Sequence, residues 1–507
     1  MHIHADSALI AALADDLREA RFTSESIRAA WGVAADNAFA RGTRVPALRA
    51  LKNRTDATAV LARLFVLGVA QPAADVAAAV PTVGLEGLRA LSLIRGDDMC
   101  APTVLIRPQS FVDEAGVGEW WVASDLDETA LGGALPDDHV LGVGGASLTL
   151  AGLQVPTPAG SVFDLGTGCG IQALRARRHA DRVVATDISE NALAFARFNA
   201  LLNGVADIDV RAGSLFEPVA GETFDRIVSN PPFVITPRRD DVPAYEYRDG
   251  GMQGDDLVAA VFAGVGEHLK PGGIAQFLGN WEYRWGTDGL DRVRAWVENS
   301  PVPLDAWVIE REQLDPAEYA ALWIRDGGTV QGTDAHELLL DAWLDDFAHR
   351  NVTAIGFGYV LLRRPVEGSP TLGRFERVTS PIPAEGTIGA HLSDMLAAHD
   401  AVGMLSDDDL AALHLVTAPD VTEKRHYLPG AEDPTVIELN QGSGFGRALS
   451  VDPDLAALVG ACDGELSLQQ INDAIAHLWE VDPVALRADL LPRVRELIIG
   501  GFLRTSA

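Results

Sequence analysis

One stretch decides the fold of this chain: residues 162–171, which read VFDLGTGCGI. Its apolar first half is typical of a buried strand, and an apolar helical pattern follows it. Between the two, Gly166, Gly168 and Gly170 allow a sharp turn and let a ligand approach the backbone closely, because glycine has no Cβ. A strand, a glycine-rich turn and a helix in this order predict a cofactor site at the carboxyl end of a parallel sheet.

A second strand supports this prediction. Residues 183–187 read VVATD, so an apolar strand ends in the carboxylate of Asp187. An acidic residue about 20 positions past a glycine turn commonly binds the hydroxyl groups of a ribose. The dinucleotide pattern is not met, because Ile171 stands where its third glycine would be. Asp164, just before the turn, would repel a pyrophosphate and suit a cationic ligand, so we expect a different nucleoside-bearing cofactor.

A third stretch, residues 230–233, reads NPPF and follows a strand-like run. Two prolines cannot continue a central strand, because they lack the N–H groups of the ladder, so the chain must leave the sheet here. The Asn230 side chain and the carbonyls beside Pro231 and Pro232 would offer two acceptors, which suit a planar NH2 group. Phe233 would add a flat apolar face for stacking. The stretch predicts a clamp for an amide or exocyclic amine nitrogen.

Together the three stretches resemble the class I S-adenosylmethionine-dependent methyltransferases. Residues 164–170, with the pattern D-x-G-x-G-x-G, are similar to motif I of these enzymes, and Asp187 is similar to their ribose-binding acid. Residues 230–233 resemble the (Asn/Asp)-Pro-Pro-(Tyr/Phe) motif of the branch that methylates amino groups. The resemblance implies an α/β fold with a doubly wound, Rossmann-like sheet of seven strands, and S-adenosyl-L-methionine as the cofactor. It also implies a catalytic set: Asn230, Pro231, Pro232 and Phe233.

The cofactor-binding residues that the resemblance implies lie at strand ends: Asp164, Gly166, Gly168, Gly170, Asp187, Ile188, Ser214, Leu215 and Asn230. One position departs from the pattern, because Ser214 stands where many members carry an aspartate that holds the adenine amino group. Adenine binding would then rest on backbone groups, with Ser214 a weaker partner. Residues 230–237 and the glycine-rich acidic segment 247–257 resemble the protein-glutamine methyltransferases that modify translation release factors. The small-domain methyltransferases acting on ribosomal RNA share the core motifs.

The length of 507 residues predicts about three domains. Residues 1–135 read as helices followed by a β-hairpin, an order that suggests a winged helix. Residues 136–365 alternate strand and helix and form the methyltransferase-like domain, with a helical insertion at 316–350. Within it, the glycine-rich segment 140–147 either covers the methionine end of the cofactor, as in related enzymes, or is a flexible linker. Residues 366–507 predict a small, mostly helical α+β domain, with a second winged helix as one option.

The charge of the chain limits its partners. With 40 Lys and Arg against 72 Asp and Glu, the net charge at pH 7 is −32. Phosphate backbones repel such a protein, which disfavours nucleic acid, although the basic cluster from Arg41 to Arg54 is a candidate local basic face. No run of about 18 residues is apolar throughout, so we expect no membrane span. Three scattered cysteines favour a reducing cytoplasm and argue against a metal site.

Three functions fit these motifs. The first is methylation of a glutamine side chain in a protein, such as a translation factor, and this is the favoured interpretation. The second is methylation of an exocyclic base nitrogen, adenine N6 or guanine N2, in RNA or DNA. The third is a non-catalytic binding module, which would predict a damaged clamp or glycine turn, and neither is damaged. A small metabolite amine is a weaker fourth. The outer domains must decide between the first two, and the sequence sets no oligomeric state.

Overall fold

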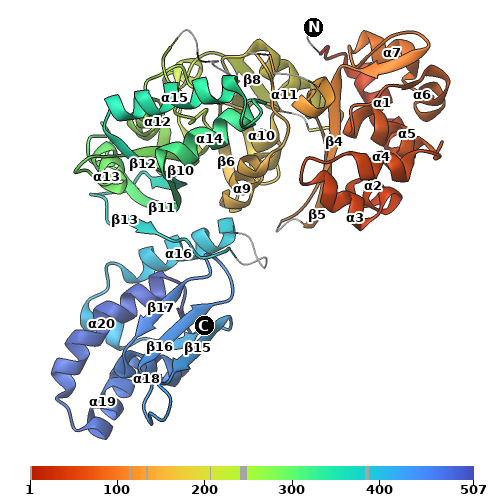
Figure 1. Cartoon of the computed structure of the whole chain (residues 1–507). Helices are drawn as coiled ribbons and strands as arrows, with labels where there is room; N and C mark the ends of the chain where they lie inside the picture. Colours follow the sequence, from red (N-terminus) through yellow and green to blue (C-terminus); the bar gives the residue numbers. More distant parts are fainter. Residues whose placement is uncertain are drawn as a thin grey trace. The chain divides into compact units, whose positions relative to one another are not determined.

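The structure is a computed structural model that describes residues 3–113, 116–132, 135–136, 138–205, 207–239, 242, 248–382 and 388–506. The chain divides into two compact units (Figure 1). The first consists of Met1–Ala151 and Pro158–Glu376, and the second of Gly152–Thr157 and Arg377–Ala507. All the predicted site residues belong to the first unit. Among the described residues, no helix is both long enough and apolar enough to cross a membrane.

The centre of the first unit is an eight-stranded mixed sheet with the strand order β13-β11-β12-β10-β9-β6-β7-β8. Its strands are β6 (Ala159–Leu165), β7 (Ala180–Asp187), β8 (Ile208–Ala212), β9 (Phe224–Ser229), β10 (Leu269–Arg284), β11 (Asp305–Leu314), β12 (Val352–Arg363) and β13 (Gly373–Arg377). Strands β6 to β10 run parallel to one another, whereas β12 is antiparallel to both β10 and β11. The parallel half is the part that the glycine-rich turn predicted.

The strand count differs from the sequence prediction. All seven predicted strands are present, but β13 adds an eighth at the edge of the sheet next to β11. This strand reads GRFER and has no fully buried residue, so it lacks the apolar run that marks the central strands. The central strand β6, by contrast, buries Val162 and Phe163 completely, as expected for a strand covered on both faces.

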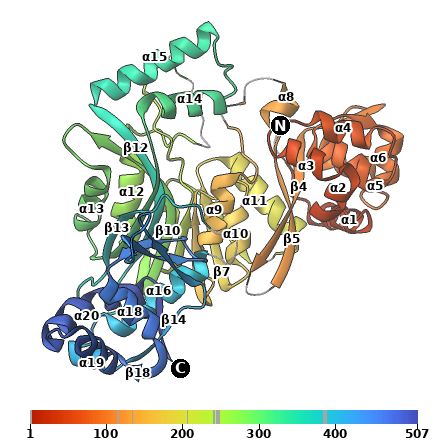
Figure 2. The ribbon, with the colours of Figure 1, turned by 60° about the horizontal axis from the view of Figure 1, so that its bottom comes forward.

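Helices flank the sheet along its length. They are α9 (Gly145–Leu153), α10 (Ile171–Ala176), α11 (Glu190–Leu202), α12 (Asp256–Val265), α13 (Gly289–Glu298), α14 (Pro316–Asp326) and α15 (Asp334–His349). Figures 1 and 2 show α10 and α11 beside the β6–β8 end, and α12 and α13 beside β10. Helices α14 and α15 form the predicted insertion between β11 and β12. Asp315 and Thr333 begin these two helices, because their side chains accept the first free backbone N–H groups.

The N-terminal part is helical and ends in a long hairpin. Its helices are α1 (Ser7–Glu19), α2 (Ser24–Trp31), α3 (Val33–Phe39), α4 (Val45–Leu51), α5 (Ala57–Leu61), α6 (Ala73–Ala79), α7 (Gly84–Ala90) and α8 (Glu128–Leu131), with a π-helical turn at Ala62–Val66. Short strands β1 (Gln71–Pro72), β2 (Ile94–Arg95) and β3 (Met99–Pro102) form a small sheet, and β4 (Val104–Asp113) pairs with β5 (Gly116–Asp125). The winged-helix assignment and the domain boundaries at 135 and 365 stay predictions.

A single apolar core joins this helical part to the sheet. It includes Phe22 and Phe65 from the N-terminal helices, Ile106 from β4, and Phe195 and Phe198 from α11. In both overall views the hairpin stands between α1–α7 and the α10–α11 side of the sheet. The N-terminal part is therefore packed against the helices that follow the glycine-rich turn and β7.

The second unit has a core of its own, in which Leu439, Val494 and Phe502 are buried. Its helices are α16 (Ile388–Val402), α17 (Asp407–Ala411), α18 (Pro453–Ala461), α19 (Leu468–Trp479) and α20 (Pro483–Ile499). Two three-stranded sheets accompany them, one with the order β18 (Asp463–Ser467), β14 (His414–Thr417), β19 (Leu503–Thr505), the other β15 (Val421–His426), β16 (Val436–Gln441), β17 (Ala448–Val451).

Candidate active site

The parallel strands end in register at one edge of the sheet. Leu165, at the end of β6, pairs with Thr186 of β7 and with Ser229 of β9, and Asp187 pairs with Ala212 of β8. The residues that follow these positions therefore emerge side by side. They are the residues that the three sequence motifs singled out: Gly166, Asp187, Ser214 and Asn230.

The three glycines of the turn have different surroundings. All have a positive φ, 72° at Gly166, 53° at Gly168 and 85° at Gly170, which L side chains rarely adopt. A Cβ added at Gly166 or Gly168 would meet nothing within 4 Å, whereas at Gly170 it would lie 3.1 Å from Ala196 of α11. The first two glycines thus leave space for a ligand. Gly170 does not line the cavity and instead permits close packing of the turn on α11.

Asp164 lies behind the turn. It is fully buried, and its Oδ2 accepts hydrogen bonds from Thr167 Oγ1 at 2.6 Å and from the Ala173 amide at 3.0 Å. Its Oδ1 has no hydrogen-bond donor among the described residues. Burial, with a smaller contribution from the charge of Asp187, raises the pKa of Asp164 to about 7, although the hydrogen bonds from Thr167 and Ala173 oppose this shift. Asp164 does not line the cavity, so in the protein alone it braces the turn and the start of α10.

Asp187 connects the turn to the end of β7. Its Oδ2 accepts from the Gly168 amide at 2.9 Å and its Oδ1 from the Ser189 amide at 3.0 Å. Burial raises the pKa of Asp187, while these backbone hydrogen bonds lower it. The Asp187 carbonyl also accepts from the Gly213 amide at 3.0 Å, which places Ser214 and Leu215 beside the same space.

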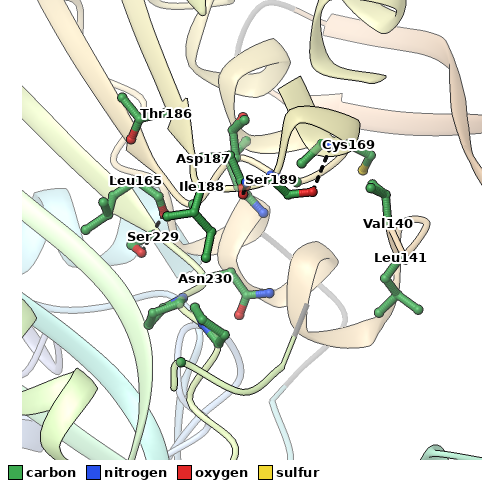
Figure 3. Close-up of a pocket in the computed structure, with 18 of the residues that line it drawn as sticks. Val140, Leu141, Leu165, Cys169, Thr186, Asp187, Ile188, Ser189, Ser229 and Asn230 are labelled. Atoms are coloured by element: carbon green, nitrogen blue, oxygen red, sulfur yellow. Dashed lines mark hydrogen bonds between the residues drawn. The ribbon is translucent and has the colours of Figure 1, made fainter. Parts of the chain in front are cut away.

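The clamp residue Asn230 projects from the end of β9 into the same space (Figure 3). Its neighbour Ser229 is fixed, because the Ser229 hydroxyl donates to the Leu165 carbonyl at 2.7 Å. The Oδ1 atom of Asn230 is buried, and no donor among the described residues bonds to it. A buried acceptor without a donor costs about 1–3 kcal/mol, so this atom is suited to an N–H group from a ligand.

Phe233 lies apart from the other three clamp residues. Only 8% of it is exposed, and it does not line the cavity. Its ring packs against Phe357 at 5.3 Å and against Trp323 at 6.3 Å between centroids. The predicted stacking of a substrate on Phe233 therefore has no open ring face in the protein alone, and the role of Phe233 stays a prediction.

The strand ends enclose a cavity of about 200 Å³. Nine of the predicted residues line it: Gly166, Gly168, Asp187, Ile188, Ser214, Leu215, Asn230, Pro231 and Pro232. The opposite wall includes His139, Val140, Leu141 and Gly142, so the glycine-rich segment covers the cavity and is not a free linker (Figure 3). Burial lowers the pKa of His139 to about 4, which leaves this imidazole neutral at pH 7.

The prediction missed several lining residues, among them His139, Gln172 and Met252. Gln172 lies on α10 and donates to the Ser147 carbonyl at 2.7 Å, which attaches the covering segment to the helix. No motif marks Gln172 or His139, although Met252 lies in the glycine-rich acidic segment. Tyr247, at the start of that segment, lies outside the described residues.

The insertion supports the chain that follows the clamp. The Ile235 amide donates to Tyr319 Oη of α14 at 3.1 Å, and Arg248 donates to Asp326 at 2.9 Å. Further on, Arg350 forms an ion pair with Glu282, which is fully buried. A Cβ on Gly254 would lie 2.8 Å from both of these charged side chains, so the segment passes directly over the pair. The side of the cavity next to the clamp, called the acceptor side below, thus depends on a buried ion pair and on the insertion.

Comparison with known protein families gives matches in three parts of the chain. Residues 144–282 match the family described as Methyltransferase small domain. Residues 19–104 and 396–505 match two families described as domains of unknown function, DUF7059 and DUF7782. A solved methyltransferase from Pyrococcus furiosus overlaps 43% of this chain and 80% of its own, with 16% identity and a TM-score of 0.26.

Curated relatives match the same part of the chain. The release factor glutamine methyltransferase of Geobacter sulfurreducens is 38% identical over 125 residues, which are 23% of this chain and 43% of that protein. The ribosomal protein uL3 glutamine methyltransferase of Bradyrhizobium diazoefficiens is 34% identical over 151 residues, 28% of this chain and 46% of that protein. The chain spans about half the length of the curated relatives it matches. The predicted resemblance to methyltransferases, and the α/β fold of the sheet, are confirmed.

Proposed function

We propose that this protein is an S-adenosylmethionine-dependent N-methyltransferase whose acceptor is the side-chain amide of a glutamine in another protein. The observation that carries the proposal is the buried, donor-free Oδ1 of Asn230 beside a cavity formed by the glycine turn and Asp187. The relatives that match residues of this domain support the glutamine assignment, since they are named for that reaction.

The residues present fit the cofactor. Gly166 and Gly168 leave open space at the turn, and Asp187 stands where a carboxylate would accept from ribose hydroxyl groups. Ser214 and Leu215 lie where the adenine would be held, and the loop amide at Gly213 is already bonded to Asp187. Asp164 supplies a buried carboxyl behind the turn, with Oδ1 free of donors among the described residues.

The chemistry divides between the cofactor and the clamp. When bound, S-adenosylmethionine supplies a methyl group attached to a positively charged sulfur, and this sulfur is the leaving group that keeps the electron pair of the broken S–C bond. Asn230 Oδ1 and a backbone carbonyl beside Pro231 and Pro232 would accept hydrogen bonds from the two N–H groups of the substrate amide. These hydrogen bonds fix the nitrogen and favour the positive charge that develops on it, before one proton is released to water. No strong base is needed at this site.

The acceptor class follows from the charge of the chain. A net charge of −32 disfavours approach of a phosphate backbone and favours a protein, especially one with a basic surface. An amide nitrogen has the planar NH2 geometry that two fixed acceptors recognise, as does the amino group of a base. The experiment must therefore separate the two macromolecules directly.

The test uses the full chain, tritiated methyl-labelled S-adenosylmethionine and an extract of cells in which the gene has been deleted, so that the acceptor is unmethylated. We expect macromolecular label that protease releases and nuclease does not, and acid hydrolysis of that label should yield methylamine, the product of an N-methyl amide. Asn230→Ala should abolish most of the labelling, whereas Asn299→Ala, at the exposed end of α13, should not.

Each alternative gives a different result. Label released by nuclease would replace the protein acceptor with a nucleic-acid base. Label in small molecules alone would indicate a metabolite amine. No label at all, together with no binding of S-adenosylmethionine by calorimetry, would show that the domain is not a methyltransferase.

A further inference from the structure

The wall that covers the cavity has no regular secondary structure of its own. Val140, Leu141 and Gly142 line the cavity but lie outside any helix or strand. Such a segment keeps one conformation only when its backbone groups are bonded elsewhere. Both backbone groups of Val140 are bonded to the end of hairpin strand β5, which belongs to the N-terminal part of the chain.

Asp125, the last residue of β5, makes the main connection. Its Oδ2 accepts from the Val140 amide at 2.8 Å and from Asn191 Nδ2 of α11 at 2.8 Å. Its own amide donates to the Val140 carbonyl at 3.2 Å, so both backbone groups of Val140 are bonded to one residue. Asn191 also donates to the Asp138 carbonyl at 3.2 Å, which fixes the wall two residues before Val140.

The preceding residue of β5, Ser124, lies against the wall as well. A Cβ added to Gly142 would lie 2.9 Å from Ser124 Oγ and 3.5 Å from Ser124 Cβ. By contrast, a Cβ added to Gly144, two residues later, would meet nothing within 4 Å. The wall therefore approaches β5 closely at Gly142 and has left it by Gly144.

The strand β5 is itself held by asparagines of α11. Asn199 accepts from the Ala123 amide at 2.7 Å and donates to the Ala123 carbonyl at 2.9 Å, and it also donates to the Cys169 carbonyl of the glycine turn at 2.8 Å. Asn203 pairs in the same way with both backbone groups of Trp121. The two side chains take the place of a neighbouring strand, so β5, α11 and the glycine turn form one hydrogen-bonded assembly.

The far end of the hairpin is fixed to the helix that follows the turn. Arg178, just after α10, makes two hydrogen bonds to Asp113 at 2.8 and 2.7 Å. The guanidinium groups of Arg175 and Arg178 lie 4.4 and 5.1 Å from the centre of the Phe111 ring. The hairpin is thus attached at its tip, along its edge and at its last residue.

We propose that Asp125 is a positioning residue for the cofactor, and that through it the N-terminal hairpin sets the wall of the cofactor cavity. The inference rests on the proposed function only in naming S-adenosylmethionine as the ligand. The hairpin is then a part of the binding site and not only a link to the N-terminal helices. Loss of the Asp125 carboxylate should release Val140 and weaken cofactor binding, although no residue that lines the cavity has been replaced.

The experiment compares full-length Asp125→Ala and Asp125→Asn with the unaltered chain. Asparagine keeps an oxygen that can accept both hydrogen bonds, whereas alanine keeps none. We expect the alanine variant to bind S-adenosylmethionine about tenfold or more weakly by calorimetry, and the asparagine variant to stay within about threefold, as for a hydrogen bond to a charged acceptor. Without ligand, hydrogen exchange at the Val140 amide should accelerate in Asp125→Ala.

The control is Asp16→Ala, which removes another buried aspartate that accepts backbone N–H groups, from Thr82 and Val83 in the N-terminal helices. It should lower thermal stability and leave cofactor affinity unchanged. If Asp125→Ala fails to fold, Gly142→Ala against Gly144→Ala tests the adjoining contact between the wall and Ser124, and only the first should both weaken binding and accelerate exchange at the Val140 amide.

Equal affinity in Asp125→Ala and the unaltered chain, with faster exchange at Val140, would overturn the inference and leave the proposed function intact. Absence of binding by the unaltered chain would instead remove the proposed function. Exchange at Val140 in the unliganded protein would still report whether Asp125 holds the wall.

Discussion

The two sides of the cavity are supported by different chemistry. On the cofactor side, the side chains of Asn199, Gln172 and Asp125 support the cavity through hydrogen bonds to backbone groups. On the acceptor side, Glu282, Arg350 and Asp255 form a buried ionic cluster beneath the segment that follows the clamp. Hydrogen bonds from side chains to backbone fix a local conformation, whereas a buried ion pair is expensive to break because one charge is left behind.

This difference separates two kinds of constraint. The cofactor side holds main chain that must keep one shape. The acceptor side holds the segment that follows the clamp, which the proposed protein substrate would have to reach, and its supports come from an insertion between β11 and β12. Variants on the two sides should therefore differ in what they lose: affinity on one, stability and turnover on the other.

The largest effect is expected from Arg350→Ala. Its side chain is 9% exposed, and its removal leaves Glu282, with no exposed area, without one of its cationic partners. Breaking a buried pair from one side costs about 3–5 kcal/mol. Urea denaturation of the full-length chain should show this loss in the free energy of unfolding of the first unit. Arg18→Ala, which breaks an exposed pair with Asp15 in the same unit, should cost no more than about 1 kcal/mol. Similar losses in the two variants would show that the ionic cluster is not a special support.

Asn230→Ala should be next in size and should act on turnover. Loss of an aligning hydrogen bond is expected to lower kcat by about 10²-fold or more, because the acceptor nitrogen is no longer fixed. The variant should bind S-adenosylmethionine almost normally and melt at nearly the temperature of the unaltered protein. Single-turnover kinetics with saturating cofactor give the comparison. An unchanged rate would exclude Asn230 from the reaction.

Asp187→Ala should show the opposite pattern. Its carboxylate accepts from the Gly168 and Ser189 amides and faces the cavity, so cofactor affinity should fall about 10- to 100-fold. Turnover at saturating cofactor should fall much less. Calorimetry measures the affinity, and a variant that binds as tightly as the unaltered protein would place the ribose elsewhere.

The smallest effect is a pH dependence from Asp164. Its folded-state pKa of about 7 lies above its ordinary value of 3.8, so between these values the folded protein holds a proton that the unfolded chain releases. The contribution of Asp164 to the free energy of unfolding is therefore fully present below about pH 4 and declines as the pH rises through 7. Asp164→Asn removes this titration, so its stability relative to the unaltered protein should increase from pH 5 to pH 8 in parallel denaturation series. Superimposable pH profiles would contradict a buried, protonated Asp164.

Sequence reasoning located the strands and nine of the lining residues because each motif marks a strand end. Strand register then brings Gly166, Asp187 and Asn230 together without further information. Sequence reasoning did not distinguish Gly170 from the other two glycines of the turn, since only tertiary packing shows that Ala196 lies against Gly170. The role of Phe233 was also out of reach, because the rings that cover it come from β12 and the insertion.

The supports were harder to predict than the site. Asn191, Asn199 and Asn203 belong to α11 or its end, where asparagine is a poor helix former. Three such residues at helical spacing are a signal for side chains that bond to backbone outside the helix. The β5 residues they bond to carry no motif, so only the structure shows which strand is paired.

The buried thiol of Cys169 offers a way to observe the glycine turn. Its side chain lines the cavity but is only 4% exposed, and burial raises its pKa to about 11, so it is protonated at neutral pH. Cys100 and Cys462 are buried too. Alkylating reagents should thus leave the folded chain unmodified, and a slow appearance of adduct at Cys169 would time the opening of its loop.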